Sequence, residues 1–113
     1  MKISMMREGL DIHVSKDDTK LTVALKGRLD TSTAPELEME MIPLLKGVTE
    51  LTMELAELEF ITSAGLRVLL QAVQIMKDQG EMTVTNPNSE VREVFDLTGF
   101  SGILTIKPEI EAD

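Results

Sequence analysis

The stretch LEFITSAGLRVLL, residues Leu58–Leu70, places two hydroxyl side chains and a glycine between two apolar runs. The apolar residues after Ser63 recur at helical spacing as far as Gln79, whereas the run before Thr62 is typical of a β-strand. The hydroxyl groups of Thr62 and Ser63 therefore lie where the loop after a strand becomes a helix. Either group can accept a hydrogen bond from the free N–H groups of the first helical turn, and the small residues that follow let that turn approach the neighbouring strand.

Four segments alternate between apolar and polar residues, which predicts strands that bury one face. The polar residues of these strands leave the other face of the sheet hydrophilic, so we expect helices to cover one face only. The polar segment SKDDTK, Ser15–Lys20, predicts an antiparallel hairpin between the first two strands. The apolar positions are Leu10, Ile12 and Val14; Leu21, Val23 and Leu25; Leu51, Met53 and Leu55; and Met82 and Val84.

Three further segments have apolar residues at the spacing of a helix. Thr33 is the predicted N-cap of the first helix, with Pro35 in its first turn. Residues Ile103–Ile106 are expected to add a short strand or a packed tail, and residues 1–8 and 108–113 to fray. The predicted helices with their terminating residues are Thr33–Lys46 with Gly47, Ser63–Gln79 with Gly80, and a third that begins after Asn88 or Ser89 and ends at Gly99.

The resulting order is β-β-α-β-α-β-α, an α/β fold with a mixed sheet of four to five strands and helices packed on one face, in which residues 1–113 form a single domain. Two connections are strand–helix–strand crossovers, which makes the second, third and fourth strands parallel. Parallel strands end at one edge of the sheet, and ligand and partner sites lie at that edge in folds of this kind. The edge brings together Gly27–Thr33, Glu57–Gly65 and Asn86.

The composition excludes several classes of protein. Of the 113 residues 42% are hydrophobic, so we expect a soluble globular protein. The absence of cysteine excludes disulfides and thiolate chemistry. A net charge of −9 disfavours nucleic-acid binding and favours a partner with a basic surface, although ordinary solubility explains the charge equally well. Charged residues near the N-terminus exclude a signal peptide and no run could span a membrane, so we expect a cytoplasmic location without membrane insertion.

A second interpretation of Thr62–Gly65 is a phosphorylation site. A phosphate adds roughly −1.5 to −2 charges, and the positive end of the helix dipole can stabilise it by up to about 2 kcal/mol. The modified protein would therefore stay folded. A partner bound at the same place would meet a new buried charge, and each ~1.4 kcal/mol of that cost lowers the affinity tenfold. Modification here would act on binding and not on stability.

Three segments together resemble the STAS-domain anti-sigma factor antagonists of bacterial partner-switching systems. They are GRLDTST at Gly27–Thr33, LTMELAELEFITSAGLRVLL at Leu51–Leu70 and VREVFDLTGF at Val91–Phe100, and the resemblance extends over most of the chain, from Leu10 to Ile106. It implies that an anti-sigma factor, which is also an ATP-dependent serine kinase, phosphorylates the first serine of the family's Asp-Ser-Ser/Thr-Gly-Leu motif.

Matched position by position, the phosphorylated serine of that family falls on Ser63, with Gly65 and Leu66 as the family's Gly-Leu pair. Thr62 stands in place of the usual aspartate. Ala64 replaces the second hydroxyl residue, which leaves Ser63 as the one matched acceptor.

Residues outside the central motif complete the predicted partner surface. Asp30 matches an acidic position near the kinase contact of the family, whereas Glu54 stands where a strand aspartate is common and is interpreted as an exposed strand carboxylate. The second helix also has an extra stripe of small or apolar residues, which either packs on a neighbouring helix or joins a docking surface: Gly65, Val68, Ala72 and Ile75. The predicted partner contacts are Asp30, Thr31, Thr33, Thr62, Ser63, Ala64, Gly65, Arg67 and Val68.

The segment is only partly similar to the G-x-S-x-G nucleophile elbow, because Ile61 occupies the first glycine position. The one histidine, His13, precedes the serine and lies on a polar strand face, so we predict no catalytic triad and no enzymatic activity. Glu36, Glu38 and Glu40 are spaced by two, which scatters them around a helix, and no glycine-rich phosphate loop occurs. We therefore expect no metal and no cofactor.

The sequence thus predicts an anti-sigma factor antagonist that is monomeric when free. The unmodified chain would bind an anti-sigma factor/serine kinase, phosphorylation of Ser63 would release it, and a serine phosphatase would reset the switch. The alternative from another class is a STAS subunit of a transporter or signalling complex, which would use the same edge without being phosphorylated.

Overall fold

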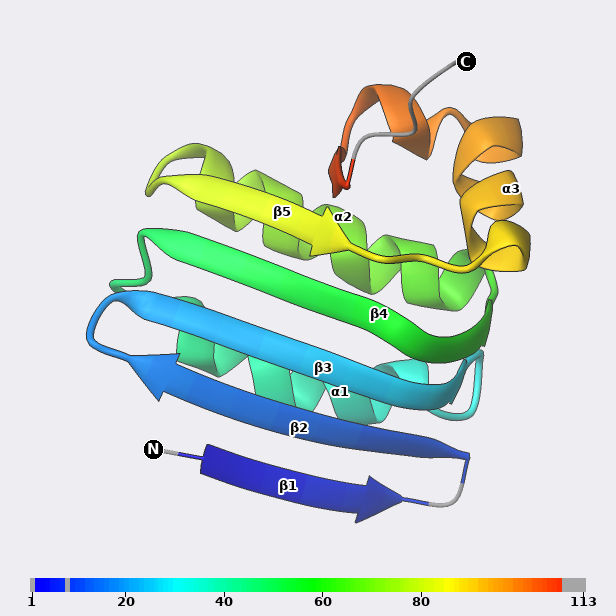
Figure 1. The fold of residues 1–113 in the computed structure, drawn as a ribbon. Helices are drawn as coiled ribbons and strands as arrows, with labels where there is room; N and C mark the ends of the chain where they lie inside the picture. The colour runs from blue at the N-terminus through cyan, green and yellow to red at the C-terminus, as the bar shows by residue number, and fades with distance from the viewer. Residues whose placement is uncertain (1, 8, 109–113) are drawn as a thin grey trace.

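The chain folds around one mixed β-sheet of six strands in the order β1-β2-β3-β4-β5-β6 (Figure 1). The structure, a computed structural model, describes residues 2–7 and 9–108. The strands are β1 (Lys2–Arg7), β2 (Leu10–Asp17), β3 (Lys20–Leu29), β4 (Glu50–Ile61), β5 (Glu81–Thr85) and β6 (Thr105–Lys107). The helices are α1 (Ala34–Met41), α2 (Ser63–Lys77) and α3 (Ser89–Thr98), with short 3-10 turns at Ile42–Leu45 and Phe100–Gly102.

The strand pairing follows the predicted topology. β1, β2 and β3 are antiparallel neighbours, whereas β3, β4, β5 and β6 run parallel. The β2–β3 hairpin turns between Asp17 and Lys20, with Asp18 in the left-handed conformation (φ 56°). The carboxyl ends of β3, β4 and β5 consequently meet at one edge of the sheet, and the predicted α/β fold is confirmed.

Edge strands extend the sheet beyond the four to five strands predicted. Lys2–Arg7 pairs with β2 over its whole length, where a frayed terminus was expected. The adjacent residues Met5 and Met6 break the alternation by which a strand is recognised in a sequence. At the other edge, Thr105–Lys107 forms β6, which is the short strand predicted for the tail. The fraying predicted for residues 1, 8 and 109–113 lies outside the described residues.

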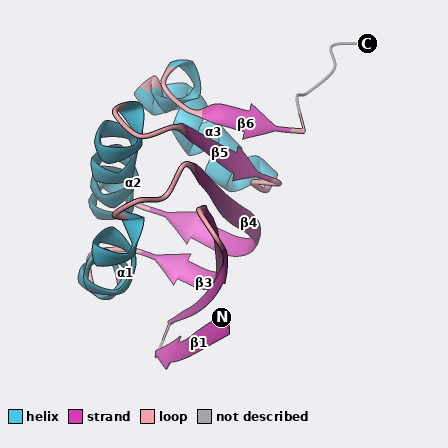
Figure 2. Ribbon diagram, turned by 90° about the vertical axis from the view of Figure 1, so that its left-hand side faces the viewer, coloured by secondary structure: helices cyan, strands magenta, loops and turns pink. Residues whose placement is uncertain are grey.

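Helices α1 and α2 cover one face of the sheet and leave the other face open (Figure 2). Fully buried side chains at alternate strand positions, such as Val23 of β3 and Met53 of β4, share one core with Leu37 of α1 and Leu69 of α2. Burial of each such side chain contributes about 1.5–3 kcal/mol. Across the open face, hydroxyl residues stand in register on neighbouring strands: Ser15, Thr22, Thr52, Thr83 and Thr105.

Two helix ends differ from the predicted ones. α1 passes into a 3-10 turn before it reaches Lys46, because Pro43 lacks the N–H that a regular helix needs. α2 is capped at Asp78, so the prediction that Gly80 is its C-cap is wrong. Glycine is required at position 80 for another reason, since a Cβ there would overlap the carbonyl oxygen of Thr49.

Helix α3 has the caps that the sequence predicts. The Oδ1 atom of Asn88 accepts a hydrogen bond from the N–H of Val91 (2.8 Å), and Gly99 ends the helix in the left-handed conformation (φ 83°). The Asn88 side chain also donates to the carbonyl of Leu58 (3.1 Å). This bond ties the start of α3 to β4, and the helix lies beyond the carboxyl end of β5 (Figure 1).

Candidate functional site

The junction between β4 and α2 lies where the sequence predicts it, because β4 ends at Ile61 and α2 begins at Ser63. Thr62 between them is extended (φ −110°, ψ 179°), and its N–H donates to the carbonyl of Leu29 (3.0 Å). The carbonyl of Thr62 accepts the N–H of Leu66 (3.0 Å), which is the first bond of the helix. Ser63 is therefore the first helical residue, and it is exposed at the carboxyl edge of the sheet.

The two hydroxyl groups at this junction have different surroundings. The Oγ1 atom of Thr62 is buried without a hydrogen-bond partner, whereas the side chain of Ser63 is exposed and forms no hydrogen bond within the described part of the chain. α2 has no side-chain N-cap, so the interpretation of these hydroxyls as capping groups is wrong. Of the two, only the Ser63 hydroxyl is accessible to an incoming group.

The backbone around Ser63 suits a negative charge. The first N–H groups of an α-helix, here those of Ser63, Ala64 and Gly65, have no carbonyl partner within the helix. Together with the helix dipole they stabilise an exposed anion by about 0.3–1 kcal/mol. The first turn of α2 contains no acidic residue that would compete for them. The fold would therefore tolerate a phosphate on Ser63.

The packing around residue 65 explains why a glycine stands at the centre of the stretch Leu58–Leu70. A Cβ at this position would lie 2.6 Å from Cγ of Leu29 and 2.9 Å from Cγ1 of Ile61. Both are buried side chains at the ends of β3 and β4. The first turn of α2 therefore packs so closely on these strand ends that it leaves no room for a methyl group.

Replacing Gly65 by alanine is expected to lower the free energy of unfolding by about 1–2 kcal/mol net, because the shift of Leu29 and Ile61 that admits the methyl group costs up to about 3 kcal/mol. The gain in helix propensity, about 1 kcal/mol, offsets only part of this cost. Denaturant unfolding followed by circular dichroism measures the change. Gly102→Ala is the matched control, since a Cβ there meets nothing within 4 Å. Equal stability of the two variants would contradict the close packing of α2 on β3.

Asp30 organises the loop between β3 and α1. Its Oδ1 atom accepts hydrogen bonds from the hydroxyl of Ser32 (2.7 Å), the N–H of Ser32 (2.9 Å) and the N–H of Thr33 (3.2 Å). The Ser32 hydroxyl, followed by the backbone N–H groups, lowers the pKa of the Asp30 carboxyl below its ordinary value. These bonds are therefore in place at neutral pH and weaken as the pH falls through the lowered pKa.

Thr33 belongs to the interior of the same loop. It occupies the N-cap position of α1, as predicted, but its side chain is only 3% exposed and makes no capping bond. Its hydroxyl donates to the carbonyl of Arg28 (2.9 Å) and accepts the N–H of Asp30 (2.9 Å). A direct contact of Thr33 with a partner stays a prediction, and its buried side chain would leave mainly the backbone for that contact. Thr33 holds the loop that presents Asp30 and the exposed Thr31.

A hollow of about 210 Å³ lies between the first turns of α1 and α2, beside Ser63. Four residues of the predicted partner surface line it: Thr31, Ala64, Arg67 and Val68. Three residues that the sequence analysis did not assign to the partner surface complete the lining: Ala34, Pro35 and Glu38. Ala34 and Glu38 are four residues apart and therefore share one face of a helix. This spacing is the feature of the sequence that could have assigned these two residues to the same surface.

The extra apolar stripe of α2 packs inside the protein. Gly65, Val68 and Ala72 are buried and Ile75 is half-buried, and α2 contacts both α1 and the 3-10 turn that follows it. The structure thus favours the packing alternative for this stripe. Arg67 is exposed and lines the hollow together with Val68 of this stripe.

Two residues that were considered for other roles lie on the open face of the sheet. Glu54 is half-buried and accepts hydrogen bonds from Thr85 Oγ1 (2.5 Å) and Asn86 Nδ2 (3.1 Å), so it links β4 to the end of β5 and is not simply an exposed carboxylate. His13 lies on β2 opposite Ala24, in a different part of the sheet from Ser63. Among residues 2–7 and 9–108, no cluster of three or more His, Cys, Asp or Glu residues could hold a metal ion.

The structure thus has an exposed serine at the first turn of the helix after a central strand, beside a hollow between two helices. The family model described as "STAS domain" matches residues 11–112, and the chain belongs to this family. No helix within the described residues has the length and apolar character needed to cross a membrane.

The chain is similar over most of its length to proteins named for anti-sigma factor antagonism. BtrV of Bordetella bronchiseptica, to which this role is provisionally assigned, is 35% identical over 91% of this chain and 90% of its own. The anti-sigma-B factor antagonist of Bacillus subtilis is 25% identical, with 90% and 94% of the two chains covered. The fold matches the crystal structure of an anti-sigma factor antagonist from Mycobacterium paratuberculosis with a TM-score of 0.81 at 23% identity, over 93% and 91% of the two chains.

Proposed function

We propose that this STAS domain is an anti-sigma factor antagonist that works by partner switching. The unmodified chain binds an anti-sigma factor that is also an ATP-dependent serine kinase, and the sigma factor is thereby freed. Phosphorylation of Ser63 releases the anti-sigma factor. The observation that carries the proposal is the exposed hydroxyl of Ser63 at the start of α2, which bonds to no other group in residues 2–7 and 9–108. The names of the two relatives support it.

The partner contacts the surface around this hydroxyl. That surface comprises the hollow between α1 and α2 and the loop that presents Asp30 and Thr31. Asp30 and Glu38 supply negative charge at this place, and the whole chain has a net charge of −9. A basic surface on the anti-sigma factor is therefore the complementary one, and long-range attraction would raise its rate of association.

In this proposal the chain is a substrate and not a catalyst. The kinase supplies ATP and magnesium. The γ-phosphoryl group passes to Oγ of Ser63, the hydroxyl proton goes to a base of the kinase, and ADP leaves. A separate serine phosphatase hydrolyses the phosphoserine and restores the binding form. The proposal also places the protein in the cytoplasm, as a monomer when it is free.

The proposal is tested by intact-mass measurement after incubation with the cognate anti-sigma factor and ATP. The wild-type chain is expected to gain one phosphate, Ser63→Ala none, and the control Ser89→Ala one, because Ser89 is likewise the first, exposed residue of a helix. A phosphate that persists in Ser63→Ala would assign the modification elsewhere. An unmodified wild-type chain, with a kinase active on another antagonist, would favour the STAS subunit that is never phosphorylated.

A further inference from the structure

Arg67 is the one cation among the described residues that line the hollow between α1 and α2. Its side chain is exposed, and it forms no ion pair or hydrogen bond within residues 2–7 and 9–108. Glu38 of α1 lines the same hollow, yet no ion pair joins these two side chains. Asp30, in the loop before α1, is engaged by the N–H and hydroxyl groups of its own loop. The guanidinium group of Arg67 is therefore available to another anion.

The sequence of α2 provides no carboxylate one turn away from Arg67. Residues three or four positions apart are neighbours on the surface of a helix. The four side chains at these distances from Arg67 are uncharged: Ser63, Ala64, Leu70 and Gln71. The whole helix contains no aspartate and no glutamate. A phosphate on Ser63 would thus be the one negative charge that α2 places within a turn of Arg67.

The geometry of a helix brings the side chains of Ser63 and Arg67 together. Helical side chains lean towards the N-terminus, so the side chain of Arg67 extends over the turn to which Ser63 belongs. The Cβ atoms of residues at this spacing are about 5–6 Å apart, and an acid that precedes a base by four residues is the favourable order. A guanidinium group donates two parallel hydrogen bonds to phosphate oxygens. The two positions therefore suit a phosphate–arginine pair.

We propose that Arg67 binds the phosphate on Ser63 within the same chain. This inference rests on the proposed function, because it requires a phosphate at this position. In the unmodified chain the guanidinium group is exposed at the partner surface. In the phosphorylated chain it donates to the phosphate oxygens. The modified surface then presents a phosphate–arginine pair in place of a neutral hydroxyl and a separate cation.

The test uses the full chain with phosphoserine encoded genetically at position 63, so that it needs no kinase. Phosphorus NMR as a function of pH gives the second pKa of the phosphate, which is about 6 for an unpaired phosphoserine. The positive charge of Arg67 favours the dianion and lowers this pKa. Arg67→Gln is therefore expected to raise it by about half a unit. Arg67→Lys should restore part of the shift, because it keeps the charge but loses the paired hydrogen bonds.

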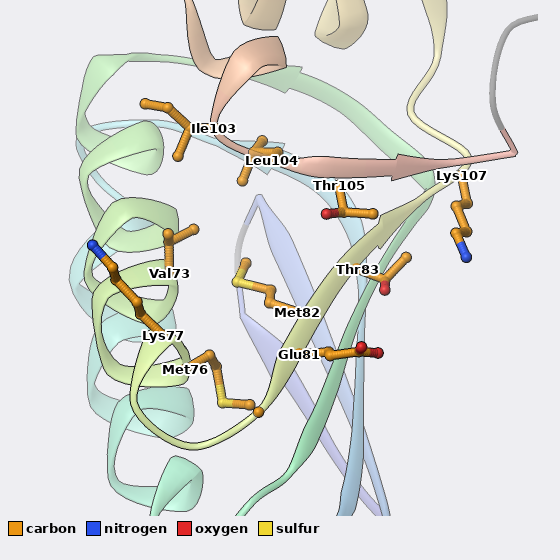
Figure 3. A pocket seen from close by; sticks show the side chains of 11 residues that line it. Val73, Met76, Lys77, Glu81, Met82, Thr83, Ile103, Leu104, Thr105 and Lys107 are labelled. Atoms are coloured by element: carbon orange, nitrogen blue, oxygen red, sulfur yellow. The ribbon is translucent and has the colours of Figure 1, made fainter.

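Lys77→Gln is the matched control, because it removes the same charge from the same helix. Lys77 lies roughly 21 Å from Ser63 at 1.5 Å per residue, where it lines a larger hollow of about 570 Å³ (Figure 3). This variant should leave the pKa of the phosphate unchanged. Equal pKa values for Arg67→Gln and the parent chain would assign the phosphate to the N–H groups of α2 alone and overturn the proposal. Equal shifts in Arg67→Gln and Lys77→Gln would also overturn it, since they would reflect net charge.

The outcomes for this inference and for the proposed function are separable. Incubation with the anti-sigma factor and ATP shows whether Ser63 is phosphorylated, whereas the titration shows only what binds a phosphate placed there. An Arg67 effect in a chain that the kinase leaves unmodified would support the pair and contradict the proposed function. A chain that is phosphorylated on Ser63 but shows no Arg67 effect would contradict the pair alone.

Discussion

The Ser63→Asp variant should bind its anti-sigma factor about 100-fold more weakly than the wild-type chain. The hydroxyl of Ser63 is exposed beside the hollow between α1 and α2, so a partner docked there covers it. A carboxylate at this position would be desolvated in the complex and would face groups arranged for a neutral hydroxyl. The cost of an unpaired charge in an interface is about 2–5 kcal/mol, and ~2.8 kcal/mol corresponds to a hundredfold loss of affinity.

The same variant should fold at least as well as the wild type, because the N-terminus of α2 stabilises an exposed negative charge by about 0.3–1 kcal/mol. Calorimetric titration gives the affinity and thermal unfolding gives the stability. Ser89→Asp is the matched control, since it places the same charge at the first residue of α3. An affinity of Ser63→Asp equal to that of the control, or a loss of affinity that merely follows a loss of stability, would exclude the switch.

Replacing Gly27 by alanine is expected to lower the free energy of unfolding by about 4 kcal/mol. Gly27 has a φ of +110°, which costs an L-residue about 1–3 kcal/mol. A Cβ there would also overlap the backbone carbonyl of Gly9, and overpacking adds about 1–3 kcal/mol. That carbonyl accepts the N–H of Arg28 (2.7 Å), so it cannot move aside without breaking the bond.

Gly99→Ala separates the two causes. Gly99 also has a positive φ (83°), but a Cβ there meets nothing within 4 Å. Only the conformational cost should remain, about 1–2 kcal/mol. Urea unfolding of both variants provides the comparison. If the two lost the same stability, the backbone contact between Gly27 and Gly9 would have no energetic consequence.

Local sequence patterns were sufficient to predict the parallel core of this fold. Val23, Met53 and Val84 alternate with polar residues, and this pattern identifies three strands and the face that each one buries. The helix between β4 and β5 is equally clear, because its apolar stripe is long and regular. The sequence did not predict the features that depend on the pairing of separate strands or on the backbone geometry of a single residue. The pairing of β1 with β2 is a tertiary event, and the 3-10 turn around Pro43 depends on the backbone geometry of a single proline.

The candidate site was predictable in its position but not in its details. Ser63 could be placed at the start of a helix because a polar interruption separates two apolar runs. The burial of the Thr62 hydroxyl and the internal role of Thr33 depend on the orientation of side chains, which no spacing in the sequence reveals. Ala34, Pro35 and Glu38 join the surface only because α1 and α2 pack side by side.

The row of hydroxyl side chains across the helix-free side of the sheet has a practical consequence. β-branched threonines favour the pleated backbone of a strand. Their hydroxyl groups keep this face of the sheet hydrated and without an apolar patch, so two copies of the protein have little tendency to associate through it. Thr22 and Thr52 occupy its middle, on the opposite side of the sheet from α1 and α2. A surface tether attached at either threonine would therefore leave the region around Ser63 accessible.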